Sequence, residues 1–518
     1  MTEAKLFGSG CVASPHYLAS AAGLAALADG GNALDAAIAV NLTLGVVTPY
    51  MCGYGGDLFT IIWAEGELHA YNGSGRAPAG ATLDSVRTAA GQNTIPAIGP
   101  LSVTVPGAVE AWFTLIDRFG TRSFAELAAP ALRLARDGFP INDLLVAHFD
   151  ALGRQYSGSW GEPWRDIYTG ANASRRFRQP ALARTIQTLI DGGPEGYYRG
   201  EIAAAISQTL QSNGAFMSKD DLGSHHGDWV DTISSTYRDI EVHQIPPSSQ
   251  GLVTLEALNI VENLDLGAAE SPERHHALIE ATKLALSDRD AYVTDLEHMR
   301  IDPAELVSKD WAAGRRELID PAHASAPAAG RAAVGGTAYF CAADGDGMLV
   351  SMIQSNYKGF GSGVTVPDWG INLQDRGSFF SLDPDHVNVI APGKRTLHTL
   401  MPAFAIRNGK PWMAFGSMGG DGQAQTQLQF LTRVVDDGRD IQDAIDAGRW
   451  VVSPDDWSVS AEARLGGELI DGLRARGHEI RSVRHNDPNF GHAHAIQVTP
   501  VGYAAAFDQR SQGAALGL

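Results

Sequence analysis

The chain has 518 residues, of which 44% are hydrophobic and 19% charged, so it can build a sizeable core and is not a disordered protein. This length suits two or three domains or one large layered domain. The 59 acidic residues outnumber the 39 basic ones, and the formal net charge of -20 argues against nucleic acid or an anionic membrane as the main partner.

The first 50 residues predict two packed helices in a cytoplasmic protein. The stretch "MTEAKLFGSGCVASPHYLAS" has an acid at Glu3 and no apolar run of secretory length, so we expect no signal peptide and a cytoplasmic location. Residues 15–48 are rich in Ala and Leu, and Gly-Gly-Asn at 30–32 is typical of one helix ending before another begins. The most apolar part, 33–47, contains Asp35 and is too short for a membrane span, so we expect a buried helix.

Strand and helix patterns alternate along the rest of the chain. In chain order they predict a hairpin at 55–75, mostly helices at 107–318, an exposed linker at 320–336, a hairpin formed by 337–343 and 348–355, a second hairpin in "MPAFAIRNGKPWMAFGS", helices at 424–435 and 441–447, and closing strands in "GHAHAIQVTPVGYAAAFD". We find no tandem repeat. A helix-rich first part and a strand-led second part favour stacked sheets covered by helices over a doubly wound sheet.

Thr337 directly follows a glycine pair at the head of the predicted hairpin, within "AAVGGTAYFCAADGDGMLVSMIQS". One interpretation is structural, because threonine favours strands and Gly-Gly is common in loops. The other is chemical: a cut between Gly336 and Thr337 would give the threonine a free α-amino group, whose pKa of about 7.7 to 8 lets it act as the base for its own hydroxyl. The glycines also permit the backbone twist in which that hydroxyl attacks the preceding carbonyl.

A second glycine pair offers hydrogen-bond donors for such chemistry. In "WMAFGSMGGDGQAQTQLQ" an apolar strand passes through Gly419 and Gly420 into a predicted helix, where backbone N–H groups have no partner within the helix. These groups are suited to binding an oxyanion. Glycine pairs at strand ends are more often tight turns, so spacing alone leaves both interpretations open.

Metal and cofactor sites are weakly indicated. Cys11, Cys52 and Cys341 are too few and too widely spaced for a disulfide framework or a CxxC site, and we expect buried, reduced thiols. His492 and His494 have a spacing that can bind a metal, but no neighbouring Cys or Glu completes a ligand set. "DGDGM" lacks the last acid of a calcium loop, and no nucleotide fingerprint is complete. We therefore expect neither metal nor cofactor.

Nine ordered blocks of sequence resemble the γ-glutamyltranspeptidase family of N-terminal nucleophile hydrolases along nearly the whole chain. They are "ASPHYLASAAGLAALADGGNALDAAIAV", "GYGGDLFTIIW", "SVTVPGAVEAW", "IPPSSQGLVTLEALNIVE", "LALSDRDAYVTD", the Gly336-Thr337 junction, "GKRTLHTLMPAF", "GSMGGDGQ" and "DQRSQGAA". The resemblance implies an α+β fold, the four-layer αββα sandwich. It also implies self-cleavage into a large chain, 1–336, and a small chain, 337–518, which stay together as a heterodimer within one αββα domain and can associate further.

The resemblance also implies roles for individual residues. Thr337 is expected to be the nucleophile, with Gly419 and Gly420 as the oxyanion hole. Ser355 keeps a hydroxyl where the family has threonine in the nucleophile hairpin, and we expect it to assist catalysis.

The substrate pocket departs from the family pattern. In "NGSGRAP" the family's carboxylate-binding arginine is replaced by Ser74, with Arg76 two residues later. The aspartate that holds the substrate amino group corresponds to Phe379. The other changes are a glutamine replaced by Arg376, a serine pair replaced by His398 and Thr399, and an asparagine replaced by Tyr357.

The aspartate change is the most informative of these, because an ammonium beside a phenyl ring loses its anionic partner and is desolvated. Arg376 and Arg76 can still bind a carboxylate. We therefore expect an amide substrate with a carboxylate on its acyl part and not necessarily an ammonium, such as a dicarboxylic monoamide.

Three functional hypotheses result. The first is a self-processing threonine amidase, with γ-glutamyl transfer or glutathione hydrolysis competing against oxamate-like or cephalosporin-acylase-like hydrolysis. The second is a catalytically silent relative kept for binding, which an uncut chain would favour. The third is a metal-dependent hydrolase built on the C-terminal histidines, whose activity would be lost with chelator and would not need Thr337.

Overall fold

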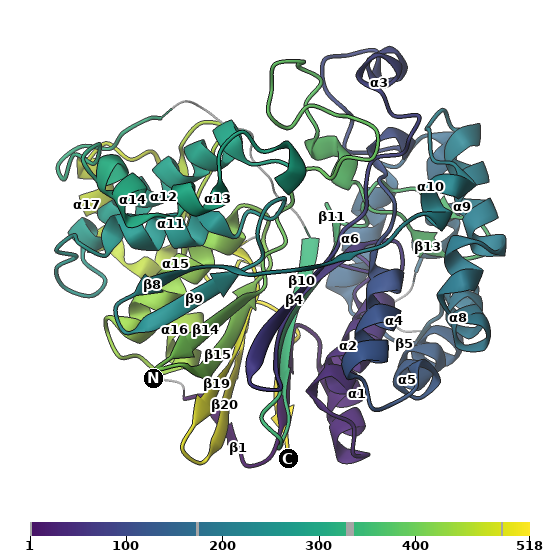
Figure 1. The fold of residues 1–518 in the computed structure, drawn as a ribbon, viewed down its shortest axis with the longest axis horizontal. Coiled ribbons are helices and arrows are strands. Elements are labelled where there is room, and N and C mark those ends of the chain that lie inside the picture. The colour runs from purple at the N-terminus through teal and green to yellow at the C-terminus, as the bar shows by residue number, and fades with distance from the viewer. Residues whose placement is uncertain (1–2, 172–175, 328–335, 488–489) are drawn as a thin grey trace.

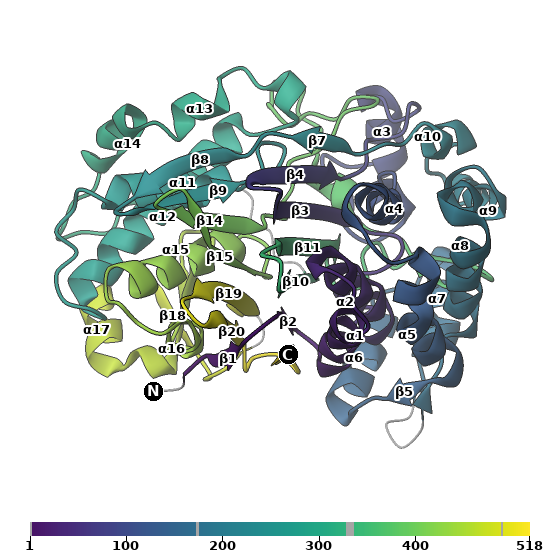
Figure 2. The ribbon, with the colours of Figure 1, turned by 60° about the horizontal axis from the view of Figure 1, so that its bottom comes forward.

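Two β-sheets stacked face to face, each covered by helices on its outer side, form the molecule (Figure 1). This computed structural model describes residues 3–171, 176–327, 336–487 and 490–518. In the order of the layers, helices, sheet, sheet and helices follow one another, and Figure 2 shows the same order from another side. The predicted αββα sandwich is therefore confirmed.

Sheet B, which carries Thr337, has seven antiparallel strands. In spatial order they are β21 (Ala514–Gly517), β2 (Cys11–Ser14), β10 (Gly336–Ala343), β11 (Leu349–Tyr357), β3 (Asp57–Ala64), β4 (Glu67–Gly73) and β7 (Asp228–Val230). Its two central hairpins, β10–β11 and β3–β4, are those predicted from their alternating apolar residues.

Sheet A faces it and also has seven antiparallel strands. In spatial order they are β1 (Lys5–Phe7), β20 (Gly502–Phe507), β19 (Ala493–Thr499), β15 (Lys410–Ser417), β14 (Ala403–Arg407), β9 (Ile240–Gln244) and β8 (Ile233–Tyr237). Residues 107–318 are mostly helical, as predicted, but the short strands β7, β8 and β9 interrupt the helices and complete one edge of each sheet.

The helices fall into two outer layers and one small cap. Those on sheet B include α1 (Tyr17–Ala28), α2 (Ala33–Val47), α4 (Ala108–Phe119), α5 (Phe124–Asp137), α6 (Asp143–Gly153), α7 (Glu162–Tyr168), α8 (Pro180–Tyr198), α9 (Glu201–Ser212) and α10 (Lys219–Gly223). Those on sheet A include α11 (Leu252–Val261), α12 (Pro272–Tyr292), α13 (Pro303–Leu306), α14 (Lys309–Arg316), α15 (Gly422–Val435), α16 (Ile441–Asp446) and α17 (Gly467–Ala475). Helix α3 (Leu83–Ala90) lies in the cap, a small apolar cluster in which its Val86 packs with Ile95, Phe380 and Ile390.

Three hydrophobic cores hold the layers together. One lies between sheet B and its helices, one between sheet A and its helices, and one between the two sheets. Every residue of α2 is buried, as predicted, and Asn32 begins this helix with a capping box to Asp35. The three cysteines are buried and unpaired, as predicted. None of the described helices is long and apolar enough to cross a membrane.

The predicted linker at 320–336 is described only as far as Pro327, and 328–335 lies outside the described residues. Side chains from other elements hold its first part. Lys283 Nζ donates to the Ser325 carbonyl at 2.8 Å, and Trp457 Nε1 donates to the Pro327 carbonyl at 2.8 Å. Residues 320–327 are therefore attached to the body of the protein, although several of their side chains are exposed.

A chain of buried polar side chains runs from α4 to the β10–β11 hairpin. Trp112 Nε1 donates to Asn41 Oδ1 at 2.6 Å, and Asn41 Nδ2 donates to Gln354 Oε1 at 3.2 Å. Gln354 Nε2 in turn donates to the Gly53 carbonyl at 2.6 Å. Asn41 thus satisfies two buried groups from different layers, which are costly to leave unpaired.

We predict that Asn41→Leu lowers the free energy of unfolding by about 2–4 kcal/mol, because it leaves the buried Trp112 N–H unpaired and removes one of the two donors to Gln354 Oε1, which keeps the Gly53 N–H. Thermal unfolding followed by circular dichroism measures the effect as a lower midpoint. Asp117→Asn, at an exposed position of α4, serves as the control. Equal midpoints for the two variants would contradict the prediction.

Candidate active site

Thr337 lies at a β-bulge near the start of β10, where Gly336 pairs with Tyr357 and the register shifts before Ala338 pairs with Gln354. Its side chain is 1% exposed in the uncut chain. Gly336 is required by close approach, because a Cβ there would lie 2.6 Å from the Tyr50 carbonyl oxygen. The bulge therefore holds the predicted scissile bond in a fixed conformation.

The Ser355 hydroxyl connects the groups around that bond. Thr337 Oγ1 donates to Ser355 Oγ at 3.1 Å, and Ser355 Oγ donates to the Gly336 carbonyl at 2.6 Å. The Tyr357 N–H donates to Ser355 Oγ at 2.6 Å and so helps to hold Tyr357 at a φ of 77°. One hydroxyl thus contacts the expected nucleophile and polarises the carbonyl that precedes it.

The glycine pair lies between β15 and α15 with both backbones in the left-handed region, φ being 130° at Gly419 and 59° at Gly420. The Gly419 carbonyl accepts from the Gly422 N–H at 3.0 Å, so the Gly420 N–H of the same peptide points the opposite way. Neither the Gly419 nor the Gly420 N–H donates to any group in the described ranges. Two adjacent donors are therefore free for an oxyanion.

The two glycine-containing segments lie at the same end of the sandwich. A Cβ placed at Gly416 would lie 2.4 Å from the ring of Tyr339, so the end of β15 lies against the start of β10. Tyr339 is two residues after Thr337, and Gly416 is three residues before Gly419. The fold thus brings the expected nucleophile and the expected oxyanion donors to one rim.

Arg376 is surrounded by three of the other predicted pocket residues. Its guanidinium lies 4.1 Å from the ring centroid of Tyr357 and 6.0 Å from that of Phe379, and Nη1 donates to Thr399 Oγ1 at 3.0 Å. The side chain is buried, and Nη2 has no hydrogen-bond partner in the part of the chain that the structure describes. A buried guanidinium with a free edge is suited to binding a carboxylate.

Two buried carboxyl groups flank this arginine and were not identified from the sequence. Burial raises the pKa of Asp57 to about 7, against the opposing effect of Arg376 and of the Gly75 and Gly107 N–H groups. Burial likewise raises the pKa of Asp375 to about 7, against the Lys358 N–H and Arg376. Both groups therefore change charge near neutral pH.

His398, expected in the substrate pocket, orients one of these carboxyls. Its Nε2 lies 3.2 Å from Asp57 Oδ2, and its Nδ1 accepts from the Leu400 N–H at 3.3 Å. Burial and the nearby charges of Arg376 and Arg395 hold the pKa of His398 well below its usual range. A neutral imidazole therefore donates to Asp57, and it is not a second cation in the pocket.

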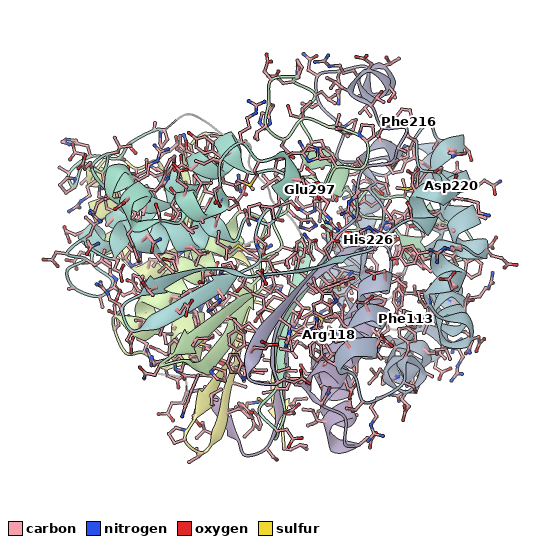
Figure 3. All side chains as sticks on the ribbon, in the orientation of Figure 1. Phe113, Arg118, Phe216, Asp220, His226 and Glu297 are labelled. Atoms are coloured by element: carbon pink, nitrogen blue, oxygen red, sulfur yellow. The ribbon has the colours of Figure 1, made fainter. Side chains whose placement is uncertain are left out.

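Arg76, the other predicted carboxylate ligand, already has a partner. Its Nη2 lies 3.1 Å from Asp228 Oδ2, and Nη1 donates to the His226 carbonyl at 3.3 Å. Arg395 also pairs with Asp228. His226 lies near the middle of the face shown in Figure 3, and its side chain is exposed. Arg76 is thus neutralised at the surface, and its contact with substrate stays a prediction.

The histidine pair considered for metal is deeply buried. Burial lowers the pKa of His492 to about 4 and that of His494 to about 3. Among the described residues, the one cluster with metal-ligand geometry is elsewhere, and its members are His276, Glu280 and His478. These bond to one another and to protein groups instead: His276 Nδ1 lies 2.8 Å from His478 Nε2, and Glu280 pairs with Lys283 at 2.8 Å.

The sequence is similar to proteins of known family. The gamma-glutamyltranspeptidase family model matches residues 19–518. A glutathione hydrolase-like YwrD proenzyme of Bacillus subtilis is 40% identical over 98% of this chain and 98% of that protein. An oxamate amidohydrolase proenzyme of Klebsiella pneumoniae is 37% identical, again over 98% of both.

The fold is similar to that of a solved enzyme. A crystal structure of cephalosporin acylase from Bacillus halodurans superposes with a TM-score of 0.95 at 37% identity, covering 100% of this chain and 97% of that one. The arrangement of layers is therefore that of a known hydrolase.

We predict that Arg376→Met changes stability with a sign that depends on pH. At pH 6 Asp57 and Asp375 are mostly protonated, so removing a buried cation that lacks an ionised partner stabilises the fold. At pH 8 the wild-type arginine stabilises their ionised forms. The variant raises both pKa values further, so its stability continues to fall as pH rises.

Melting temperatures of wild type and Arg376→Met at pH 6 and pH 8 measure this crossover. Arg481→Met, which removes an exposed arginine, is the matched control and should show no such change of sign. A variant that is equally destabilised at both pH values would contradict the prediction.

Proposed function

The chain belongs to the γ-glutamyltranspeptidase family of amidohydrolases, and from this premise we propose that it is a self-processing threonine amidase. The observation that carries the proposal is the contact of one Ser355 hydroxyl with both the Thr337 hydroxyl and the Gly336 carbonyl. Two relatives that match 98% of the chain are proenzymes, which supports processing of this chain.

In processing, Thr337 Oγ1 attacks the Gly336 carbonyl carbon while Ser355 stabilises the charge that develops on the oxygen. The C–N bond breaks, the threonine nitrogen takes the proton, and an ester to Thr337 Oγ1 forms. Water then hydrolyses the ester, giving a Gly336 carboxylate and a free Thr337 amine. The two chains remain together because each sheet contains strands from both.

In substrate hydrolysis the free α-amine takes the proton from Thr337 Oγ1, which attacks the amide carbonyl of the substrate. The Gly419 and Gly420 N–H groups bind the oxyanion, the amine leaves, and an acyl ester remains on Thr337. Water or an acceptor amine releases the acyl group. The free N–H groups of the glycine pair support this step.

The acyl group that suits this pocket carries a carboxylate. Arg376 has a free guanidinium edge and is buried, whereas Arg76 is paired with Asp228. By the resemblance, Phe379 replaces the aspartate that holds the substrate ammonium in the family. A substrate without an ammonium, such as a dicarboxylic monoamide, is therefore favoured. The similarity to an oxamate amidohydrolase agrees with this substrate class.

A γ-glutamyl amide is the second candidate, because one further observation favours it. Asp375 Oδ2 is buried with no hydrogen-bond partner in the described ranges, and this aspartate directly precedes Arg376. A carboxylate beside a carboxylate-binding arginine can replace the missing partner of the ammonium. The similarity to a glutathione hydrolase-like protein is consistent with this alternative.

We predict that purified wild type consists of two chains that end at Gly336 and begin at Thr337, and that Thr337→Ala stays whole because it lacks the attacking hydroxyl. Intact mass spectrometry under denaturing conditions decides this. Ser355→Ala should slow the cut by about 100–1000-fold, since one oxyanion donor is lost. A wild-type chain of full-length mass would favour a silent relative with a binding role.

We predict that Arg376→Met raises KM for a dicarboxylic monoamide about 10–100-fold, because a buried charge-assisted contact to its carboxylate is lost. Initial rates over a range of substrate concentrations measure this. Arg76→Met serves as the control and should change KM less than threefold. If the double variant keeps the KM and kcat of wild type, neither arginine binds the substrate.

Wild-type kcat should rise with pH toward about 8 as the Thr337 amine loses its proton. KM for the monoamide should rise above pH 7, because ionised Asp57 and Asp375 then compete with the substrate carboxylate for Arg376.

A further inference from the structure

Gln250 connects the two halves of the site through its side-chain amide. Its Nε2 donates to the Gly420 carbonyl at 3.0 Å and to the Thr399 carbonyl at 3.1 Å. Gly420 belongs to the expected oxyanion hole, and the hydroxyl of Thr399 accepts from Arg376 in the acyl pocket. Gln250 is fully buried on the segment that enters α11. One NH₂ group therefore holds the backbone on both sides of the expected acyl group.

Arg289 of α12 determines which way this amide points. Its Nη1 donates to Gln250 Oε1 at 2.8 Å, so the oxygen faces the guanidinium and the NH₂ group faces the two carbonyls. The same nitrogen also pairs with Asp421, directly after Gly420. Arg289 is fully buried and has a second carboxylate, Asp290, at 2.7 Å. The network is thus rigid and charge-assisted.

This network anchors a loop that is otherwise lightly held. Gly419 and Gly420 have no side chains, and their N–H groups must stay unpaired to bind an oxyanion. The Gly419 carbonyl is already bonded to the Gly422 N–H within the loop, whereas the Gly420 carbonyl has two donors, the Gln423 N–H at 3.2 Å and the Gln250 amide. Of these two donors, only Gln250 comes from outside the loop and its helix.

We propose that Gln250, oriented by Arg289, is the positioning residue that fixes the oxyanion glycines relative to the acyl pocket. This inference rests on the proposed amidase function for its catalytic consequence, and its structural part is independent of it. Removing the amide donors should let Gly420 move while the pocket arginine stays in place. An interaction made through the oxyanion affects the transition state, so kcat should fall and KM should stay nearly constant.

The test compares Gln250→Leu with Gln429→Leu. Gln429 is a matched buried glutamine on α15, whose Nε2 donates to the Gln425 carbonyl at 3.0 Å and the Trp450 carbonyl at 2.9 Å. Hydrogen exchange of the peptide containing Gly419–Asp421 is measured in the protein as purified. Steady-state kcat and KM are measured on any amide that wild type cleaves. Gln250→Glu, which keeps size and shape but lacks the donors, gives the same comparison if the leucine variant fails to fold.

We expect faster exchange at 419–421 and a 10–100-fold lower kcat for the Gln250 variants, with KM within threefold of wild type. Gln429→Leu should keep wild-type values for both. Unchanged exchange at 419–421, or faster exchange with unchanged kcat, would overturn the inference. If wild type cleaves no amide, the proposed function fails while the exchange comparison still decides whether Gln250 holds the loop.

Discussion

The structure of the site depends on one bulged position in the β10–β11 hairpin. Here the ladder skips Thr337, and Ser355 Oγ takes the place of a backbone partner by bonding to the Gly336 carbonyl, the Thr337 hydroxyl and the Tyr357 N–H. This hydroxyl also helps to hold Tyr357 at positive φ, and the Tyr357 ring lies against Arg376. The expected nucleophile and the expected pocket wall are therefore positioned by the same local distortion.

Several buried ionisable side chains lie close to this bulge. Arg376, Asp57 and Asp375 have little contact with water, and burial moves the carboxyl pKa values toward neutrality. Burying these charged groups lowers the stability of the fold, whereas apolar side chains packed in the same volume would not. The three surrounding hydrophobic cores offset that cost and keep the groups in place. The expected acyl pocket is therefore polar inside a largely apolar sandwich.

Local pattern was enough to predict the helices around Gly-Gly-Asn and the main hairpins, because apolar spacing and turn residues are local properties. Strands β8 and β9 were missed because "ISSTY" and "IEVHQ" are short and partly polar, although only β8 is an edge strand and β9 is paired on both sides. Thr337 and the glycine pair were predicted as catalytic residues from their motifs, and that role stays a prediction. The roles of Gln250 and Arg289 were not, because their partners lie 170 and 132 residues away in the sequence.

The strand order has a consequence for how the protein is made. Sheet B alternates segments from before and after Gly336, with β2 between β21 and β10, and β11 beside β3. Sheet A places β1 beside β20 and β9 beside β14. Two severed pieces would have to rebuild both sheets by bimolecular encounter, without the covalent connection that raises their effective concentration. The uncut polypeptide can thus form both sheets within one molecule. Two separated pieces could refold only after meeting each other, which is a slower and less favourable process.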